Sequence, residues 1–583
     1  MTEQNKYYRT LFSGTIIQQS ALSIGGSDVF SDADDPCFRD GRNRLTIPGT
    51  SLAGALIETL MRLFPDFGVA KDVKQGRKQG DKISGKSRNG LPSGGDEKYW
   101  LSVLRFKNLH LPVDRTTEWR QGVGIRQATG GAAKAKKALF DFEVVPAGSC
   151  WEFFLDLDIV RGGEETEAMV ISALNEWVEG RTWLGRNAVR GTGWIRLESP
   201  KIVRLPLKPE MICLYPDNTR IRDDSKIIEE LVGVGAEEMS WQKAVQWAGA
   251  VCQKLKLRKS AWCYMTINVG LNVGEQANGF GLNPMQVGGH CALGLAPQLK
   301  RQLFPFSLKA IIDSDEVFRD KREWEGANAT NDKPFSSTGK SGNPENVETL
   351  PFLPGSGVRG AFRHTVSRLE RMRNRSNGVP AIGLKEAGAN DGAHIWGILD
   401  PNVKEFMLEK AIKQLAGCQP ERKILLERDI RASNAVPLDS VVRVFGFEKL
   451  SSRILFRDAS LIDDKDWLIV KQEQHAEDEF AAGVFGTSKF NADALMKGHL
   501  GFQIVIEAPD LAEMKTTLRL LAPSLELARL GHLPMGGGKW KGCGWIPWDI
   551  REMALVQLNG KTGRPDDGFD IPVDERFSRL LEN

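Results

Sequence analysis

Apolar residues follow a helical period and a strand period in turn along the chain, and this order occurs twice. Leu52, Leu56, Leu60 and Leu63 recur at spacings of four, four and three, which predicts a helix with one apolar face. Apolar side chains alternate with others over residues 151–157, and GFQIVIEA at 501–508 has the same character. This alternation predicts strands that bury one face.

The helical pattern has a second copy 306 residues later. IPGTSLAGALIETLMRL at 47–63 aligns with LPGSGVRGAFRHTVSRL at 353–369, with Pro-Gly and a second glycine in the same places. The second copy puts Val358, Phe362 and Val366 on its apolar stripe. The alternative is two ordinary amphipathic helices with similar starts, but the shared glycines favour two copies of one folded unit.

A glycine-rich segment closes each copy. LGRNAVRGTGWI at 184–195 aligns with MGGGKWKGCGWI at 535–546, so that a basic residue precedes Gly-x-Gly-Trp in both. Glycines allow positive φ and a close approach of the backbone, and consecutive N–H groups suit phosphate oxygens. A glycine-rich turn into a strand is the alternative. The recurrence of the segment after the same helix start favours a phosphate contact.

Each half then has the order strand, glycine-opened helix, strand, long hairpin-like excursion, strand, helix, strand. In the first half these elements are expected near 8–18, 51–64, 101–111, 112–138, 139–158, 164–180 and 192–199. A β-α-β-β-α-β order is the ferredoxin-like split, in which two helices cover an antiparallel sheet, and RNA-recognition modules use the same architecture. The expected fold class is therefore α+β, with two such domains in tandem.

The expected boundaries follow from the two copies. The first domain spans 1–200, the second spans 303–550, and 551–583 form a polar tail. Residues 201–302 belong to neither copy and form an interdomain module, with a helix expected over 240–257 and a strand over 261–272. This module would set the spacing between the two domains.

Composition excludes several classes of protein. Apolar residues are 41% and charged residues 26% of the 583, which is ordinary for a globular protein and excludes a mostly disordered chain. The eight cysteines contain no CxxC pair and no HExxH occurs, which argues against a zinc site. No apolar run of 18 residues and no apolar N-terminal segment occur, so we expect a cytoplasmic protein without a membrane partner.

Charge has to be read locally, because a net charge of +3 does not by itself indicate a nucleic-acid-binding protein. Residues 69–98 are rich in Lys and Arg and are expected to be a flexible loop, which either follows RNA phosphates or is a solvated insertion. GDKISGKS at 80–87 formally matches a nucleotide-binding P-loop. Its flanks, KDVKQGRKQ and RNGLPSGGDEK, are neither a buried strand nor a helix start, so we reject an NTPase.

The motifs taken together resemble those of the RAMP superfamily (repeat-associated mysterious proteins). IPGTSLAGAL, ALFDFEVVPAG at 138–148 and GRNAVRGTGW carry the likeness in the first half, and LPGSGVRGAF, VVRVFGFEKLSSRILFRDASL at 441–461 and GGGKWKGCGW carry it in the second. The resemblance covers roughly 8–200 and 303–550. More narrowly, the chain is similar to backbone subunits of type III CRISPR effector complexes, and its tandem form is similar to the two-unit subunits of type III-D.

The resemblance implies an RNA-guided antiviral ribonucleoprotein. Such subunits bind the backbone of a guide RNA (crRNA), insert a thumb-like hairpin from each domain between guide and target RNA, and cleave the target with a loop aspartate and a divalent metal such as Mg²⁺. The implied partners are crRNA, target RNA, further RAMP subunits and the large polymerase/cyclase-like subunit. Cleavage requires the ribose 2′-OH to be in line with the scissile phosphate, an arrangement that a splayed strand provides.

The matching loop of the first domain is residues 24–51, and the resemblance assigns its catalytic and metal-binding position to Asp34 in DADDPCFRD. Asp35 is the nearest competitor, and Asp28, Asp32 and Asp40 are weaker ones. The alternative is a solvated acidic loop or an incidental calcium-like cluster, although the run lacks the glycine at position six and the closing glutamate of an EF-hand.

The second domain departs from the pattern. Its equivalent stretch, 311–357, is longer and lacks Asp-x-Pro at the matching place, although Asp332 and Asp320 are conceivable substitutes. We therefore expect the second domain to bind RNA and to cleave poorly or not at all.

The expected RNA contacts combine glycine-rich backbone, helix starts and basic side chains. Arg120 and the lysines at 136 and 137 on the hairpin-like excursion are further candidates, and Trp194, Trp540 and Trp545 either stack on bases or pack in the core. The residues expected to bind RNA are Gly49, Ser51, Arg126, Lys134, Arg190, Gly191, Gly355, Ser356, Arg359, Lys539, Lys541 and Gly542.

Two other functions stay open at this point. The chain could be a scaffold that binds guide RNA and leaves cleavage to partners, or a stand-alone endoribonuclease that processes guide precursors. The second activity commonly uses a histidine or lysine as acid–base catalyst in this superfamily. No histidine is near the motif loops of the first half in sequence, and the second half offers only His364 and His532.

Overall fold

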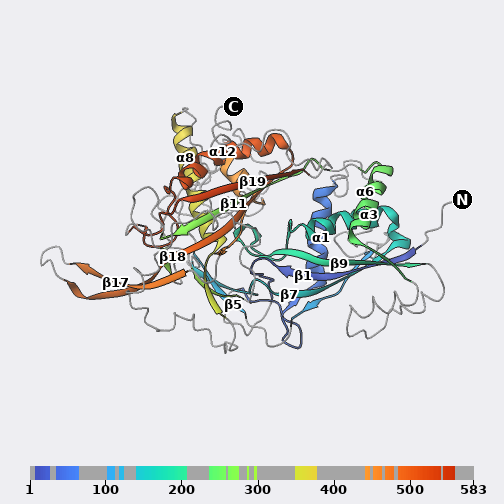
Figure 1. Ribbon diagram of the computed structural model, residues 1–583, viewed down its shortest axis with the longest axis horizontal. Coiled ribbons are helices and arrows are strands. Elements are labelled where there is room, and N and C mark those ends of the chain that lie inside the picture. Colours follow the sequence, from blue (N-terminus) through green and yellow to red (C-terminus); the bar gives the residue numbers. More distant parts are fainter. Residues whose placement is uncertain are drawn as a thin grey trace, which may run out of the picture.

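Two antiparallel sheets, each flanked by helices, form the body of the molecule (Figure 1). The structure is a computed structural model that describes residues 7–26, 35–64, 102–111, 117–123, 139–206, 236–257, 260–274, 285–287, 294–298, 348–376, 440–446, 451–462, 467–477, 484–539 and 542–557. Both sheets have the strand order of a ferredoxin-like fold, so the α+β prediction is confirmed for the described residues.

The first sheet runs β10-β9-β1-β7-β3, with β1 at its centre. The strand β1 pairs antiparallel with both β7 and β9. The helices α1 and α3 pack against the sheet, and the four leucines of the predicted stripe on α1 are all buried. The bounds are β1 Tyr7–Gln18, α1 Gly49–Leu63, β3 Leu104–Phe106, β7 Cys150–Asp158, α3 Ile159–Val178, β8 Thr182–Trp183, η2 Ala188–Arg190 and β9 Trp194–Pro206.

The second sheet repeats this plan. Its path is β13-β14-β16-β18-β11-β19, and β15 also pairs with β18, so that β11 takes the central place that β1 has in the first sheet. The stripe on α8 is buried at Val358, Phe362 and Val366. The bounds are β11 Cys263–Val273, β12 Met285–Val287, β13 Gly294–Gln298, β14 Glu348–Leu353, α8 Gly355–Ser376, α11 Ser440–Phe445, β15 Ile454–Phe456, β16 Ala459–Leu461, β17 Trp467–Glu477, β18 Val484–Ala508, α12 Leu511–Arg529 and β19 Trp548–Gln557.

The interval 201–302 is not a separate module. Its first part belongs to the first domain, because β10 (Glu237–Met239) extends the first sheet along β9 and α6 (Trp241–Lys254) packs on α3. Its second part belongs to the second domain, because β11 pairs over its whole length with β18. The predicted boundary at 303 is therefore wrong. The error arose because β11, a central strand of the second sheet, carries no sequence motif that assigns it to the second domain.

The boundary at 550 is also too early. The strand β19 continues to Gln557 and pairs with β11, so it is a strand of the second sheet rather than the start of a tail. Residues 558–583 lie outside the described residues.

Each domain has a ribbon of two paired strands. In the first domain, β5 (Glu118–Val123) pairs with β6 (Leu139–Val144), and residues 124–138 between them lie outside the described residues. In the second domain, β17 pairs with the first half of β18, and this long ribbon projects from the body of the molecule (Figure 1). A thumb-like hairpin was predicted for each domain, and the range predicted for the first, 112–138, contains β5 and ends just before β6.

The two domains share packed surface. The core cluster of the first domain includes Tyr264, Leu455 and Val505 of the second. Arg62, near the end of α1, lies 3.3 Å from the Glu507 carboxylate of β18 and 4.1 Å from the Trp183 ring centroid. Burial of Glu507 raises the pKa of its carboxyl to about 7, and the Arg62 charge opposes that rise.

Candidate nucleic-acid interface at the junction of the two repeats

Both glycine-rich segments fold into the same loop. Gly191 and Gly193 have φ of 102° and 82°, and their counterparts Gly542 and Gly544 have 80° and 78°. The Leu184 amide donates to the Gly193 carbonyl at 2.7 Å, and the Met535 amide donates to the Gly544 carbonyl at 2.9 Å. Positive φ explains the recurrence of glycine at these positions, and the predicted repeat is confirmed in three dimensions.

The first of these loops docks on the helix start of the second repeat. A Cβ added to Gly191 would meet the Asp458 backbone nitrogen at 2.9 Å, and one added to Gly355 would meet the Arg190 carbonyl oxygen at the same distance. This contact defines a junction made by Arg190, Gly191, Gly355 and Asp458. The glycines are needed here because two backbones meet without room for a side chain.

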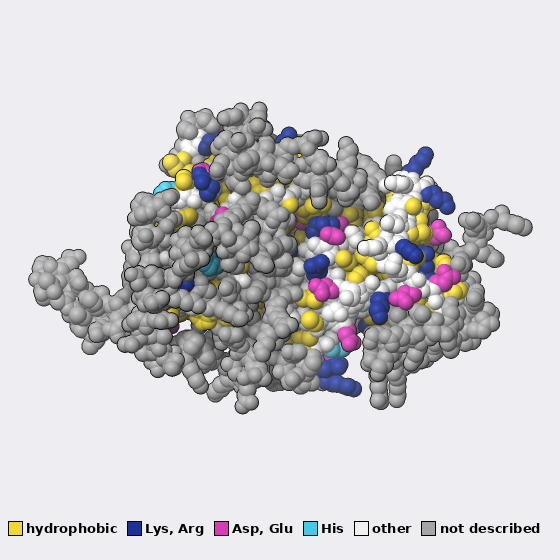
Figure 2. Space-filling model, in the orientation of Figure 1, with side chains coloured by type: hydrophobic (Ala, Val, Ile, Leu, Met, Phe, Trp, Pro, Cys, Tyr) yellow, Lys and Arg dark blue, Asp and Glu magenta, His cyan; other side chains and the backbone are white. Residues whose placement is uncertain are grey.

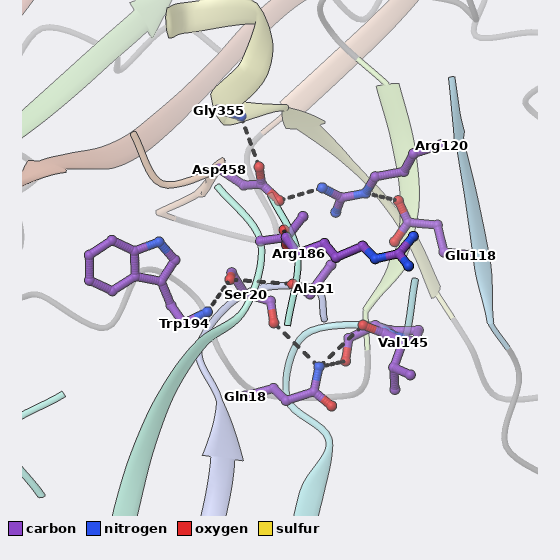
Figure 3. A network of polar contacts seen from close by, with 12 residues as sticks. Gln18, Ser20, Ala21, Glu118, Arg120, Val145, Arg186, Trp194, Gly355 and Asp458 are labelled. Atoms are coloured by element: carbon purple, nitrogen blue, oxygen red, sulfur yellow. Dashed lines mark hydrogen bonds and ion pairs between the residues drawn. The ribbon is translucent and has the colours of Figure 1, made fainter. Parts of the chain in front are cut away.

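Asp458, which lies between β15 and β16, is the polar centre of the junction (Figure 3). Its Oδ1 accepts the Gly355 amide at 2.8 Å at the start of α8, and its Oδ2 accepts Nη1 of Arg120 at 2.6 Å. Arg120 also donates through Nε to Glu118 Oε1 at 2.8 Å. Arg120 and Glu118 are on β5, so the hairpin strand of the first domain is tied to the helix of the second.

Arg120 therefore does not have the role expected of it. Its side chain is buried and held between two carboxylates, whereas an RNA contact would require it to be accessible. Desolvation raises the pKa of the Glu118 carboxyl, and the Arg120 charge opposes this rise. The residue is part of the connection between the domains.

A second charged residue ties the domains together beside Asp458. The Arg457 guanidinium lies 4.1 Å from the Trp194 ring centroid and donates to Gln19 Oε1 at 3.1 Å and to the Gly180 carbonyl at 3.3 Å. Burial lowers the pKa of Arg457 to about 9. Trp194 is 1% exposed, so it packs in the core and does not offer a face for base stacking.

Three arginines from both domains gather next to the junction. Arg359 and Arg363 lie one turn apart on α8, and their guanidinium carbons are 5.8 and 6.0 Å from the same Phe445 ring centroid. Burial, followed by the charges of Arg363 and Arg190, lowers the pKa of Arg359 to about 9. Arg359 donates to the Phe445 carbonyl, while its Nε is buried without a hydrogen-bond partner.

This arginine cluster, Arg190, Arg359 and Arg363, is suited to an anion. Like charges at a spacing of four residues destabilise a helix unless something neutralises them. Arg190 is exposed, so an anion can reach the cluster from solvent. Arg190 and Arg359 were predicted separately as RNA contacts of two different domains, and the structure brings them to one place.

At the two helix starts, the glycines that were predicted to contact RNA donate their amides to side chains of the protein instead. The Gly49 amide donates to Asn108 Oδ1 at 2.8 Å, and the Gly355 amide donates to Asp458 in the same way. Both glycines are buried, so in this arrangement neither amide is available to a phosphate. The neighbouring Ser51 is half-buried and Ser356 is exposed, and their contacts with RNA stay predictions.

The remaining predicted RNA contacts lie at the second glycine loop or outside the described residues. Lys539 is half-buried, its carbonyl accepts Nε1 of Trp545 at 3.0 Å, and Gly542 is exposed. Desolvation lowers the pKa of Lys539. Arg126, Lys134, Lys541, Trp540 and the basic stretch 69–98 lie outside the described residues.

Asp34 also lies outside the described residues, but both ends of its loop are described. The Gly26 amide donates to the Pro36 carbonyl at 2.9 Å, and the Phe38 amide donates to the Ile24 carbonyl at 2.7 Å. The Asp35 amide donates to the Asp141 carbonyl at 3.3 Å, and the Asp35 carbonyl accepts the Glu143 amide at 3.0 Å. The residue after Asp34 is thus fixed to β6.

The side chain of Asp35 is engaged by a residue of the first glycine loop. Arg186 donates through Nη1 to Asp35 Oδ1 at 2.6 Å, and both side chains are about half exposed. A carboxylate paired with a guanidinium is a poor ligand for a cation. Asp35, the nearest competitor of Asp34 in the sequence, is thus engaged by Arg186 in this structure.

One histidine lies closer to the loops than the sequence indicated. His110 of β4 (Leu109–His110) is opposite Thr46 of β2 (Thr46–Ile47), with His110 Nδ1 and Thr46 Oγ1 2.9 Å apart. Its Nδ1 is 3.5 Å from the Asp40 carboxylate. The expectation that no histidine is near the first-half loops is therefore wrong, because strand pairing brings residues 46 and 110 together.

Within the described residues, neither a cluster of metal-ligating side chains nor a membrane-spanning helix occurs. No group of three or more His, Cys, Asp or Glu side chains within them could hold a metal ion. Among the helices of the described ranges, none is both long and apolar enough to cross a membrane. Lys and Arg lie among Asp and Glu over the described part of the face in Figure 2, so this part of the face has no continuous basic surface.

A family comparison extends this picture. The model of the RAMP superfamily matches residues 22–196 and 335–546, which together are more than half of the chain. The protein belongs to the RAMP superfamily. Membership implies a CRISPR-associated, RNA-binding role. The search of curated proteins found no match. The two RAMP matches end at residues 196 and 546, directly after the two glycine loops.

Sequence reasoning missed the residues that join the two RAMP repeats. Arg457 and Asp458 follow Phe456 in LFRDA, just as Lys107 and Asn108 follow Phe106 in RFKNL. These two segments are therefore one more repeated element, which the sequence comparison of the two halves did not include. Nothing in the sequence indicated that Asp458 meets Arg120, since 338 residues separate them.

A pair of glycine variants measures how much the junction depends on close backbone contact. Gly191→Ala should lower the free energy of unfolding by about 3 kcal/mol, from backbone strain and collision with Asp458. Gly542→Ala, at the matching place of the second loop, should cost only about 1 kcal/mol, because an added Cβ meets nothing within 4 Å. Denaturant unfolding of both variants checks this, and equal losses would contradict it.

Proposed function

We propose that this RAMP protein is a backbone subunit of a type III CRISPR complex that binds crRNA at the junction of its two repeats and cleaves target RNA from its first domain. The carrying observation is the arginine cluster, to which both domains contribute. The further partners in this proposal are target RNA, other RAMP subunits and the large polymerase/cyclase-like subunit.

A phosphate of the guide RNA fits the arginine cluster. Guanidinium groups bind phosphate oxygens through charge-assisted, often bidentate hydrogen bonds. A phosphate would offset the repulsion between Arg359 and Arg363 and would give Arg359 Nε a partner. Because the cluster needs both domains in contact, RNA binding there would also favour the docked arrangement of the two repeats.

The two strand ribbons are the candidates for thumb-like elements. The β17–β18 ribbon projects from the body, and β5–β6 is anchored at its base through Arg120 and Asp458 (Figures 1 and 3). A ribbon that separates guide from target would splay the target strand. Splaying would allow the ribose 2′-OH to lie in line with its phosphate.

Asp34 is the proposed catalytic residue, and it directly precedes Asp35, whose backbone is hydrogen-bonded to β6. In the cleavage step the 2′-oxygen forms a bond to phosphorus, the bond from phosphorus to the 5′-oxygen breaks, and the 2′ proton is lost while the 5′-oxygen gains one. Mg²⁺ bound by Asp34, waters and phosphate oxygens would stabilise the charge on the phosphate. The adjacent Asp35–Arg186 pair supports the orientation of the loop.

The second domain is proposed to bind RNA with little or no cleavage. Its candidate substitutes, Asp320 and Asp332, lie outside the described residues. One cleaving domain per chain would make one cut in the target RNA for each subunit.

Salt-dependent binding tests the arginine cluster. Arg359→Gln and Arg190→Gln in the full-length protein should each weaken crRNA binding and lower the slope of log affinity against log salt by about 0.7, as for one lost phosphate contact. Arg368→Gln is the matched control, since Arg368 is exposed on the same helix. Fluorescence anisotropy over a salt series measures the slopes. Unchanged slopes in both cluster variants would contradict the proposal.

A further inference from the structure

The first glycine loop contacts the rest of the chain on two sides. On one side, Arg190 belongs to the arginine cluster and Gly191 meets Asp458 of the second domain. On the other side, the loop is hydrogen-bonded to residues 20–23, which lead from β1 into the loop of residues 24–51. One short segment therefore connects the place proposed for guide RNA with the loop of the first domain that carries the acidic run.

Backbone contacts fix the glycine loop to residues 21–23. The Gly193 amide donates to the Ala21 carbonyl at 2.7 Å, and the Arg186 amide donates to the Ser23 carbonyl at 2.8 Å. A Cβ added to Gly185 would collide with the same Ser23 carbonyl oxygen, so the two backbones are in direct contact. The glycine loop and residues 21–23 are thus expected to move as one body.

Hydrogen bonds within the glycine loop tie Arg186 to Arg190. The Thr192 hydroxyl donates to the Arg186 carbonyl at 2.6 Å, and the Arg190 amide donates to the Asn187 carbonyl at 2.7 Å. Asn187 and Gly191 take positive φ of 61° and 102° at the two ends of the turn. Because the turn is closed on itself in this way, the position of Arg186 depends on that of Arg190.

The Arg186 side chain lies on the loop base, which we define as residues 24–26 paired with residues 36–38. Gly25 and Cys37 are opposite each other in this pairing. The Arg186 guanidinium takes the space that a Cβ on Gly25 would need, and its Nη1 lies 2.6 Å from Asp35 Oδ1. A half-exposed ion pair contributes little alone, so packing over Gly25 is the more specific of the two contacts.

We propose that Arg186 is a positioning residue that couples guide RNA at the arginine cluster to the loop base, so that bound guide RNA stabilises the pairing of residues 24–26 with 36–38. This inference rests on the proposed binding of guide RNA at the cluster. A phosphate that holds Arg190 would hold the glycine loop, and through it the guanidinium over Gly25. Cleavage from the first domain would then depend on a bound guide through the protein as well as through base pairing.

Cys37 reports on the loop base. Its side chain is 2% exposed, and its Sγ donates to the Glu143 carbonyl at 3.3 Å. Burial raises the pKa of the Cys37 thiol to about 12. Since the thiolate is the form that reacts with an alkylating reagent, modification requires the loop base to open first. The alkylation rate of Cys37 therefore measures how often the pairing opens.

Alkylation by iodoacetamide of the nuclease-treated, full-length protein, with and without guide-length single-stranded RNA, tests the proposal. Mass spectrometry of the Cys37 peptide gives the rate, which RNA should lower by about 5-fold or more in the wild type. Arg186→Gln and Gly25→Ala should each lose this protection, and Arg186→Lys should recover part of it. Gly25→Ala displaces the guanidinium without removing a charge, and the φ of Gly25 lies outside the left-handed region.

Two controls separate coupling from general effects of RNA. Arg196→Gln should keep the protection, since Arg196 is an exposed arginine on β9 directly after the glycine loop. The rate at Cys252, which is buried on α6, should not respond to RNA, whereas stabilisation of the whole protein would lower both rates.

Protection that persists in Arg186→Gln and Gly25→Ala would overturn the inference, because RNA would then shield Cys37 directly. A rate that rises equally with and without RNA in these variants would also overturn it, since Arg186 would then have only a structural role. Fluorescence anisotropy of the same samples measures RNA binding. RNA that binds the wild type without protecting Cys37 contradicts this inference alone, whereas RNA that does not bind contradicts the proposed function as well.

Discussion

Asp34→Ala should abolish metal-dependent cleavage of a complementary RNA by the assembled guide–protein complex, with a loss of about 100-fold or more. The reason is that the substitution removes the carboxylate proposed to hold Mg²⁺ beside the scissile phosphate. Guide binding should be unaffected, because the arginine cluster does not include the loop. Labelled target RNA, incubated with Mg²⁺ or with EDTA, gives the rates.

Asp35→Ala is the matched control for this experiment. The Asp35 carboxylate pairs with Arg186, so its loss should loosen the loop and slow cleavage by much less than the loss of Asp34. An unchanged product pattern in Asp34→Ala would identify the chain as a scaffold or place cleavage in the second domain. Asp332→Ala would then separate these two possibilities.

Asp458→Ala should lower the free energy of unfolding by about 3–5 kcal/mol, the cost of leaving a buried charge without its partner. The substitution takes the acceptor from the Gly355 amide and leaves Arg120 buried with Glu118 alone. It should also weaken crRNA binding, because the arginine cluster needs both domains held together. Denaturant unfolding and anisotropy measure the two effects.

Asn108→Ala is the control at the equivalent place of the first domain. Asn108 is exposed and caps Gly49 without an ion pair, so about 1 kcal/mol is expected. Arg120→Met and Glu118→Gln combined with Asp458→Ala should recover part of the loss, since no buried charge is then left without its partner. Equal losses in Asp458→Ala and Asn108→Ala would show that the ion pair contributes nothing.

The sequence by itself determined the local structure of both repeats. The stripe of Leu52, Leu56 and Leu60 predicted the buried face of α1, because a helical period reports directly which side chains face a core. The paired Gly-x-Gly segments predicted two equivalent loops, because positive φ is a local requirement that glycine meets best. The strand and helix order gave the ferredoxin-like plan.

Tertiary structure alone decided how the two repeats meet. No local pattern shows that Arg120 is buried against Asp458, that Arg190 lies beside Arg359, or that β11 completes the second sheet. These contacts join residues far apart in the chain, and their energies depend on burial and on the charges nearby rather than on the residue type. The sequence therefore determined the two units, and only their packing decided which basic residues hold the domains together and which are placed to meet an anion.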